Sequence, residues 1–317
     1  MYRNIVFKGG GIKGLAYAGA LRAMERHGML QAVRRTAGTS SGAMAAVFLA
    51  LGAKPDQMVD ILLRTPFHKF MDGSRWLGGD LQRLVRDFGW FKGEVLERWA
   101  RSNIGVLTGK PHLTFGELRQ RATKEPGRFL DLTVVGANLT RETPELFDAD
   151  HTPDAPIHEA LRISMSIPLF FTAVRNIRGE VLVDGSVIWN YPISLYDRVF
   201  YTHQDAEAHP HFDAVSFNTE TIGLMVETRQ GEELIHHDVN PVADFRTYLR
   251  SILGFITDSM HSAYLSEQDW KRTVLIDALG VRTTDFHISR EQVRSLIDSG
   301  DRSFEAFVAS RKGGAGV

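Results

Sequence analysis

Apolar and polar residues alternate over the first 52 positions in blocks that predict a strand, a helix, a second strand and a second helix. The β-branched apolar stretch at residues 4–8 indicates a buried strand, and residues 15–27 have helical spacing. A second strand at about 32–37 and an apolar helical run at 43–51 follow. Because a β–α–β–α order brings its strands together in parallel, with helices across the faces, this pattern predicts an α/β fold.

The rest of the chain extends the same architecture. Residues 55–122 predict mostly helices, and Thr114 with Glu117 fits a capping box that begins one of them. A helical part at about 240–311 closes the chain, and no turn-rich stretch is long enough to separate two domains. We therefore expect one domain over residues 1–317, a three-layer α/β/α sandwich with a mainly parallel central sheet. The later candidate strands are 130–138, 181–183, 222–227 and 273–277.

Composition and charge narrow the class of protein. With 317 residues, 43% of them apolar, the chain can bury a substantial core, and the absence of cysteine excludes disulfides and thiolate metal sites. The balance of 37 basic against 38 acidic residues gives no indication of a nucleic-acid partner. Because the first predicted strand begins at Asn4, we expect no signal peptide. No apolar run approaches the roughly 18 residues that span a bilayer. We expect a cytoplasmic or peripheral membrane protein, with export by a route without a signal peptide still open.

Residues 38–42 read Gly-Thr-Ser-Ser-Gly at the predicted junction of a strand and a helix. A G-x-S-x-G motif in that position is typical of a nucleophile elbow, in which a strained turn exposes a serine hydroxyl. The spacing selects Ser40, and Gly38 and Gly42 leave room that a Cβ would fill. Serine is also an ordinary helix cap, so the pentapeptide alone does not decide between the two interpretations.

A second glycine cluster, Gly9 to Gly14, lies between the first strand and the first helix. Backbone N–H groups there can approach an anion closely. Beside Ser40 they could hold the oxyanion of a tetrahedral acyl intermediate, worth about 3 kcal/mol for each donor. The same residues match the dinucleotide fingerprint G-x-G-x-x-G, which requires an acidic residue about 20 positions later. The second strand instead carries Arg34 and Arg35, which disfavours a dinucleotide site.

A candidate general base is Asp184, where the apolar run 181–183 ends. Sheets of this class place their chemistry at strand ends, and Gly185 and Ser186 follow the carboxylate. An Asp-Gly pair is also a common turn, so Asp184 is a candidate base only because the serine motif and the glycine loop are also present.

Together the three motifs resemble those of the patatin-like phospholipases, whose pattern is G-G-G-x-[RK]-G, then G-x-S-x-G, then D-G-[GA]. The segment 161–171 and residues 190–193 (Asn-Tyr-Pro-Ile) are also similar to the family, so the resemblance spans about residues 4–195. Two positions depart from the pattern. Ser186 stands where the family usually has Gly or Ala, and Lys13 where Arg is commoner.

The resemblance implies a catalytic dyad, with Ser40 as nucleophile and Asp184 as base and no histidine between them. It also implies the N–H groups of Gly10 and Gly11 as oxyanion donors. The implied reaction is hydrolysis of a phospholipid or lysophospholipid ester through an acyl-enzyme, without cofactor or metal. An aspartate with its usual pKa near 3.9 is a poor base for a hydroxyl, so we expect tight positioning and a raised pKa. The oxyanion loop then comprises Gly9, Gly10, Gly11, Lys13 and Gly14, and the supporting motif comprises Gly38, Gly42, Gly185 and Ser186.

Two other functional classes stay open at this point. One is another serine acyl enzyme, either an acyltransferase or an esterase with a Ser-His-Asp triad. The other is a binding module with an idle site, against which the intact Ser40, Asp184 and glycine loop argue. Surface positions are the default for the 12 histidines, but a triad would need one that follows Asp184. Those are His203, His209, His211, His236, His237, His261 and His287.

Two stretches are candidates for peripheral contact with a membrane surface. In the first, apolar and cationic residues are mixed, as in interfacial segments, and the Gly-Ser pair at 73–74 suits a movable flap. Core packing explains its apolar residues equally well. In the second, residues 242–265, apolar residues recur at helical spacing, which core packing explains better than membrane contact. The sequence does not indicate an oligomeric state. The first stretch comprises Phe67, Phe70, Met71, Trp76 and Leu77 among His68, Lys69 and Arg75.

Overall fold

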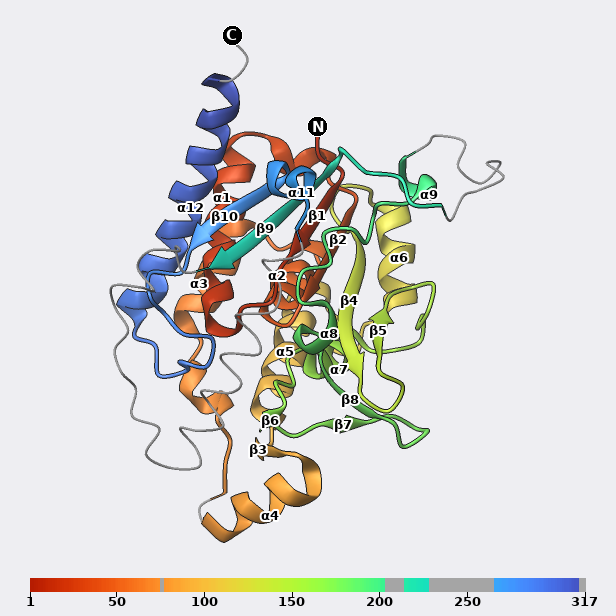
Figure 1. Ribbon diagram of the computed structural model, residues 1–317, viewed down its shortest axis with the longest axis vertical. Helices are drawn as coiled ribbons and strands as arrows, with labels where there is room; N and C mark the ends of the chain where they lie inside the picture. The colour runs from red at the N-terminus through yellow and green to blue at the C-terminus, as the bar shows by residue number, and fades with distance from the viewer. Residues whose placement is uncertain (75–76, 203–213, 228–264, 314–317) are drawn as a thin grey trace.

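A computed structural model describes residues 1–74, 77–202, 214–227 and 265–313 (Figure 1). Its centre is an eight-stranded sheet in the order β10-β9-β1-β2-β4-β8-β7, with β5 paired to β4. The five strands from β10 to β4 are parallel, whereas β8 and β5 pair antiparallel with β4, and β7 with β8. The strands are β1 Asn4–Phe7, β2 Arg35–Thr39, β4 Asp131–Asn138, β5 Thr143–Phe147, β7 Val174–Arg175, β8 Val181–Asp184, β9 Thr221–Glu227 and β10 Thr273–Asp277.

Burial on both faces explains why the central strands read as continuous apolar runs. All four residues of β1 are buried. Ile5 and Phe7 belong to the large hydrophobic core on one face, and Val6 between them belongs to a smaller cluster on the other. This alternation sets which side chains point toward which layer.

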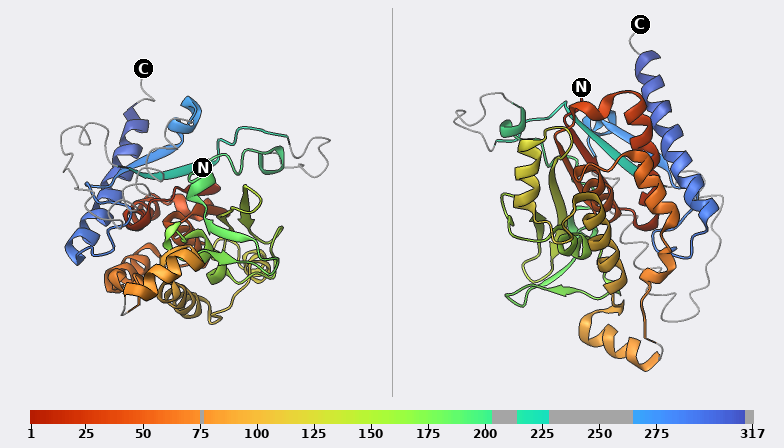
Figure 2. Two further views of the ribbon diagram at one scale, coloured as in Figure 1. Left: turned by 60° about the horizontal axis from the view of Figure 1, so that its bottom comes forward. Right: turned by 180° about the vertical axis from the view of Figure 1, so that it is seen from behind.

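The larger core lies under a layer of helices, with α1 packed between α3 and α12 (Figure 2). The first helical segment begins as a tight 3-10 turn, η1, which forms the glycine-rich loop after β1. The predicted capping box at Thr114 is confirmed: its side chain accepts from the Glu117 N–H, and the Glu117 side chain accepts from the Thr114 N–H. The helices here are η1 Gly11–Ala16, α1 Tyr17–Arg26, η2 Met29–Ala32, α2 Ser41–Ala50, α3 Pro55–Arg64, α5 Glu94–Thr108, α6 Phe115–Lys124, α7 Ile157–Ser164 and α12 Arg290–Gly313.

The opposite face of the sheet is covered by the segment that includes α8 Ser186–Trp189 and α9 Val199–Thr202. Tyr191, Ile193 and Tyr196 from this segment pack on Val6 and Met225 of the sheet. A short helix, α11 Glu267–Lys271, precedes β10. The predicted α/β sandwich with a mainly parallel central sheet is confirmed.

The region predicted as mostly helical is interrupted. Between α3 and α5 lie η3 Phe67–Phe70, α4 Leu77–Asp87 and a strand, β3 Gly89–Phe91, which pairs parallel with β6 Leu169–Phe171. Phe67 and Phe70 are buried in the larger core, so membrane contact through these two side chains, one of the two alternatives for this stretch, is wrong.

The other parts of the two candidate membrane stretches are described incompletely. Arg75 and Trp76 lie outside the described residues, and so does the second candidate stretch up to residue 264. No helix in the part of the chain that the structure describes is long and apolar enough to cross a bilayer.

Candidate active site

Ser40 occupies the turn between β2 and α2 with φ 55° and ψ −125°, a backbone conformation that residues other than glycine rarely adopt. The two flanking glycines permit this turn. A Cβ on Gly38 would lie 2.3 Å from the Gly42 carbonyl oxygen, and a Cβ on Gly42 would lie 2.5 Å from that of Phe7. The strained strand-to-helix turn that the motif predicts is therefore present at Ser40.

Hydrogen bonds from a neighbouring helix hold the turn in place. The Ser40 N–H donates to Ser164 Oγ at 2.9 Å, and the Ser164 hydroxyl donates to the Val135 carbonyl at 2.6 Å. Ser164 is the last residue of α7, and Val135 lies in β4. One buried hydroxyl thus connects the turn after β2 to the adjacent strand.

The register of the sheet brings Asp184 opposite the serine. Thr39 of β2 pairs with Val135, and Asp184 of β8 pairs with Gly136. Ser40 and Asp184 therefore lie on the two sides of β4 at the same level. Both are buried, and the Ser40 hydroxyl donates to Asp184 Oδ2 at 2.7 Å.

The carboxylate of Asp184 lies in an environment that favours its protonated form. Burial raises its pKa from 3.8 to about 6, against the opposing effect of hydrogen bonds from Ser186 and Ser40. The Ser186 N–H donates to Oδ1 at 2.8 Å. Among the described residues, no lysine or arginine forms an ion pair with Asp184. The carboxylate is thus a stronger base than an aspartate in water.

The glycine loop lies beside this pair. The Gly9 N–H donates to the Asn190 carbonyl at 2.9 Å, and the Gly10 N–H donates to Ser41 Oγ at 3.1 Å. Gly11 has φ +55°, and a Cβ there would lie 2.1 Å from the Thr283 carbonyl oxygen, so only glycine fits. Within the described segments the Gly11 N–H donates to no protein acceptor. Of the two implied oxyanion donors, Gly11 is available and Gly10 is engaged.

The remaining motif residues shape this loop and the turn around Asp184. Lys13 is buried within η1, and its N–H donates to the Gly10 carbonyl at 3.2 Å. A Cβ on Gly14 would lie 2.4 Å from Ser41 Oγ, and one on Gly185 would lie 2.4 Å from the Val135 carbonyl oxygen.

A small cavity of about 10 Å³ joins the three motifs. Lys13, Gly14, Gly38, Gly42 and Gly185 do not line it. The structure therefore separates the predicted residues into those that face the cavity and those that shape the backbone behind it. The cavity is lined by Gly9, Gly10, Gly11, Ser40, Asp184 and Ser186 from the motifs, and by Ile167, Asn190 and Thr283.

An apolar cavity of about 20 Å³ adjoins the first and shares Gly11, Ser40 and Ile167 with it. A space of this size holds about one water molecule, so an acyl chain could enter only after the walls moved. Its other lining residues are Ile12, Leu15, Ser41, Met44, Phe67, Phe70, Met165, Phe171 and Phe286.

Sequence reasoning did not identify three residues at this site. Ser164 lies in the family-like segment 161–171, but nothing in that segment marks its hydroxyl as the acceptor for Ser40. Thr283 and Phe286 come from the C-terminal third of the chain, where no motif is recognisable. Only the folded contacts bring them to the serine.

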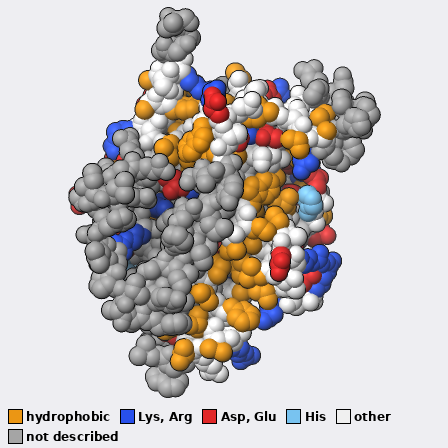
Figure 3. All heavy atoms as spheres, viewed as in Figure 1, with side chains coloured by type: hydrophobic (Ala, Val, Ile, Leu, Met, Phe, Trp, Pro, Cys, Tyr) orange, Lys and Arg blue, Asp and Glu red, His pale blue; other side chains and the backbone are white. Residues whose placement is uncertain are grey.

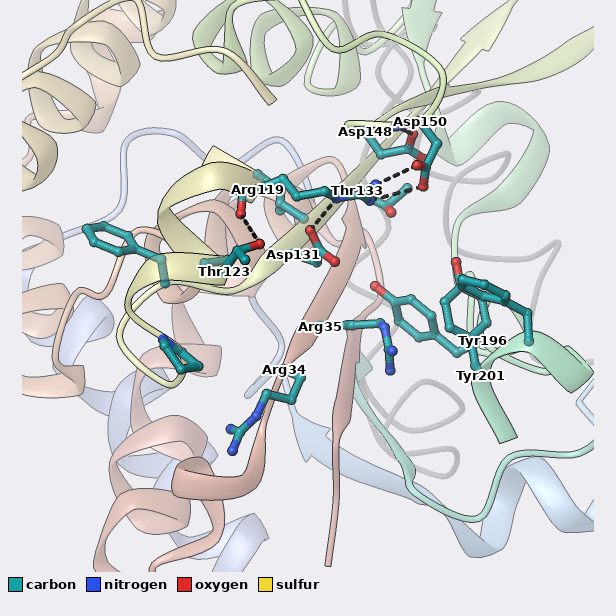
Figure 4. Close-up of a pocket in the computed structure, with 15 residues that line it drawn as sticks. Arg34, Arg35, Arg119, Thr123, Asp131, Thr133, Asp148, Asp150, Tyr196 and Tyr201 are labelled. Atoms are coloured by element: carbon teal, nitrogen blue, oxygen red, sulfur yellow. Dashed lines mark hydrogen bonds and ion pairs between the residues drawn. The ribbon is translucent and has the colours of Figure 1, made fainter. Parts of the chain in front are cut away.

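A much larger cavity, of about 330 Å³, lies at the other end of the sheet (Figure 4). Arg34 and Arg35 line it at the start of β2, whereas Ser40 follows the end of that strand. Arg119 in its wall donates to Asp131 at 2.8 Å and to Asp150 at 3.0 Å, as Figure 4 shows. The cavity contains neither member of the Ser40–Asp184 pair, so its size does not make it the site of ester chemistry.

Neither a metal cluster nor a triad histidine occurs in the described residues. No group of three or more His, Asp or Glu side chains could hold a metal ion in that part of the chain. Of the seven histidines after Asp184, the described one, His287, stacks against His68, with 6.5 Å between ring centroids. The other six lie outside the described residues.

Comparison with known proteins places the chain in a family. Residues 5–196 match the patatin-like phospholipase family. The chain is 27% identical to the uncharacterized protein YqhO of Bacillus subtilis, over 97% of this chain and 98% of that protein. It is 24% identical to the probable lipid hydrolase 463L of Invertebrate iridescent virus 6, over 61% of this chain and 63% of the viral protein.

A solved structure has the same fold. VipD from Legionella pneumophila superposes with a TM-score of 0.60 at 17% identity, and the match covers 98% of this chain and 67% of VipD. The family match extends over more than half of the chain and includes all three motifs. The chain therefore belongs to the patatin-like phospholipase family, a family of lipid-hydrolysing enzymes.

Proposed function

We propose that the protein is a lipid acyl hydrolase that cleaves the carboxylic ester bonds of phospholipids or lysophospholipids with a Ser40–Asp184 dyad. The observation that carries this proposal is the 2.7 Å hydrogen bond from the Ser40 hydroxyl to Asp184 Oδ2, formed at a turn with positive φ. The serine thus has a carboxylate, rather than an imidazole, in the position of a general base.

In the first half of the reaction, the Ser40 hydroxyl transfers its proton to Asp184 Oδ2 while Oγ attacks the ester carbonyl carbon. The negative charge that develops on the carbonyl oxygen faces the Gly11 N–H, and the Gly10 N–H can join if it leaves Ser41 Oγ. The bond to the alcohol oxygen then breaks, and the leaving alcohol takes the proton from Asp184. The acyl group remains on Ser40.

In the second half, a water molecule attacks the acyl carbon and gives its proton to Asp184. The bond to Ser40 Oγ breaks, Oγ recovers the proton, and a fatty acid is released. The raised pKa of Asp184 supports both proton transfers, because a general base is most effective when its pKa lies near the working pH.

The surroundings of Ser40 support a fatty acyl group as the part of the substrate that is recognised. The cavity next to the serine is lined almost entirely by aliphatic and aromatic side chains, among them Met44, Phe171 and Phe286. Such a surface stabilises an acyl chain by the hydrophobic effect and offers little to a polar acyl group.

The alternative is an esterase with a Ser-His-Asp triad, in which a histidine would separate the serine from the carboxylate. The direct Ser40–Asp184 contact supports the dyad instead. A dyad needs Asp184 itself as proton acceptor, whereas in a triad the acid mainly orients the histidine.

The experiment is to label the purified protein with a fluorophosphonate and to incubate it with a mixed lipid extract, following fatty acids and lysolipids by mass spectrometry. Ser40→Ala and Asp184→Asn should both abolish labelling and release, while Ser310→Ala, at an exposed serine on α12, should change neither. Each histidine→Gln variant should keep measurable activity. A folded histidine variant as inactive as Ser40→Ala would replace the dyad by a triad, and labelling at Ser41 would remove Ser40 as nucleophile.

A further inference from the structure

Helix α4 turns the ion pair of Asp80 and Arg83 toward the protein, together with Leu84. Its exposed residues include both apolar and polar side chains. Asp80 is only 4% exposed, and the Arg83 guanidinium donates to Asp80 Oδ1 at 2.9 Å and to the Trp90 carbonyl at 2.5 Å. By contrast, Leu81 is 54% exposed and Val85 is 73% exposed. Leu81 and Val85 are therefore apolar side chains on the solvent side of the helix, where polar residues are usual.

The outward apolar residues form one face. Leu81 and Val85 are spaced i, i+4, which places them on the same side of the helix. Phe88 directly follows α4 with φ 61° and is 41% exposed. Single exposed apolar residues are common on proteins, but three within eight positions, on and directly after a helix that carries a buried ion pair, are a specific arrangement. We call Leu81, Val85 and Phe88 the α4 face.

The α4 face belongs to the active-site end of the molecule. In Figures 1 and 2, α4 projects beyond the carboxyl ends of the parallel strands, the end at which β2 leads into Ser40. The helix packs on β3, which pairs with β6, and Phe171 of β6 lines the apolar cavity beside the serine. A surface bound to the α4 face would therefore lie at the end of the protein that has to receive its substrate.

Basic side chains border the α4 face. The Arg86 side chain is 78% exposed and lies 3.9 Å from the Asp87 carboxylate, which is 51% exposed. The Arg175 guanidinium lies 5.5 Å from the centre of the Phe88 ring. In Figure 3, hydrophobic side chains at the lower end of the molecule, over α4, lie beside basic ones. Apolar anchors with cations around them are complementary to a lipid surface, with its acyl interior and anionic headgroups.

We propose that the α4 face docks the protein on an anionic lipid surface, with Leu81, Val85 and Phe88 entering the acyl boundary and Arg86 and Arg175 contacting phosphates. The identification of a lipid surface as the partner rests on the proposed function. Adsorption itself does not require ester cleavage, so binding and catalysis can be measured separately.

The test measures adsorption of Ser40→Ala protein to vesicles of phosphatidylcholine and phosphatidylglycerol in equal parts, by flotation. Adding Leu81→Ser and Val85→Ser should lower the vesicle-bound to free ratio at least about tenfold, because both anchors lose apolar area. Val106→Ser is the matched control: Val106 is also a helical valine, 74% exposed, but it lies on α5, away from the α4 face, and its substitution should leave adsorption unchanged. Circular dichroism checks that each variant is folded.

Two further measurements decide between the outcomes. With Ser40 intact, the Leu81→Ser, Val85→Ser variant should hydrolyse a soluble short-chain ester at the wild-type rate and release less fatty acid from vesicles. Unchanged adsorption of this variant overturns the docking proposal, and so does a wild-type dimer that the two substitutions dissociate, because the face would then be a contact between copies. Wild-type protein that adsorbs through the α4 face but cleaves no ester would overturn the proposed function and leave the docking surface in place.

Discussion

Replacing Asp184 by asparagine should stabilise the protein at alkaline pH while it removes activity. The wild-type carboxylate is buried, and its pKa is raised to about 6 from 3.8 because burial disfavours the charged form. The folded state therefore holds a proton more tightly than the unfolded state. The stability that this proton contributes is fully present below about pH 4 and is lost as the pH rises through about 6.

The size of the effect follows from the two pKa values. At about 1.4 kcal/mol for each pH unit, the difference between 3.8 and about 6 corresponds to about 3 kcal/mol of unfolding free energy that wild-type protein loses between pH 4 and pH 8. Asparagine stays neutral and avoids this loss. Its Oδ1 can still accept from the Ser186 N–H, and its Nδ2 can donate to Ser40 Oγ, so both hydrogen bonds have replacements.

The assay is urea unfolding of wild-type and Asp184→Asn protein at a series of pH values between 4 and 8. If the two proteins have the same m-value, the difference in midpoint gives the difference in stability. The advantage of the variant should be small near pH 4 and approach about 3 kcal/mol at pH 8. Asp285→Asn, at an exposed aspartate, is the control and should show no such trend. A variant less stable than wild type at pH 8, or a difference independent of pH, would refute a raised pKa at Asp184.

Three further predictions concern the same site. Hydrolysis of a soluble ester at saturating substrate should rise with pH through about 6, because Asp184 must be ionised to accept the serine proton, and a flat profile would contradict its role as base. Gly11→Ala should lower kcat about a hundredfold, because the new Cβ would displace the loop from Thr283. The control is Gly28→Ala, at a positive φ with open space around it, which should leave kcat unchanged. Ser164→Ala should lower the free energy of unfolding by about 1–3 kcal/mol in urea titrations, because the buried Ser40 N–H loses its acceptor, and an unchanged midpoint would show that this bond contributes nothing.

The parts of the site that sequence predicts are those set by local backbone geometry. A serine between Gly38 and Gly42 at a strand-to-helix junction has few conformations available, and the structure has the strained one. The level at which Asp184 meets Ser40 depends on two strand registers with β4, one parallel and one antiparallel. Those pairings join residues far apart in the chain, so no local pattern contains them. The hydrogen bond between the Ser40 N–H and Ser164 Oγ cannot be predicted from sequence for the same reason.

The region between α3 and α5 shows a second limit of local patterns. Phe67 and Phe70 are surrounded by basic residues in the sequence, which suits an interfacial segment and the margin of a core equally well. The structure buries both rings. The orientation of α4 is likewise not set by the helix alone, because Asp80 and Arg83 form hydrogen bonds with Ser74 and Trp90, which flank the helix. Amphipathic spacing identifies two faces of a helix without showing which one meets the protein.

The energetics of the site indicate which part of it can move when a lipid binds. Ser40 has a strained backbone and Asp184 is a buried carboxylate, and such features persist only where the surrounding structure holds them in place. Here that structure is β2, β4 and β8, together with the hydrogen bonds of Ser164. The apolar cavity, in contrast, is closed by aromatic rings such as Phe70 and Phe286, whose centroids are 6.4 Å apart and which no strand pairing holds. Since this cavity holds about one water, an acyl chain bound as we propose would require these rings, rather than Ser40 and Asp184, to move.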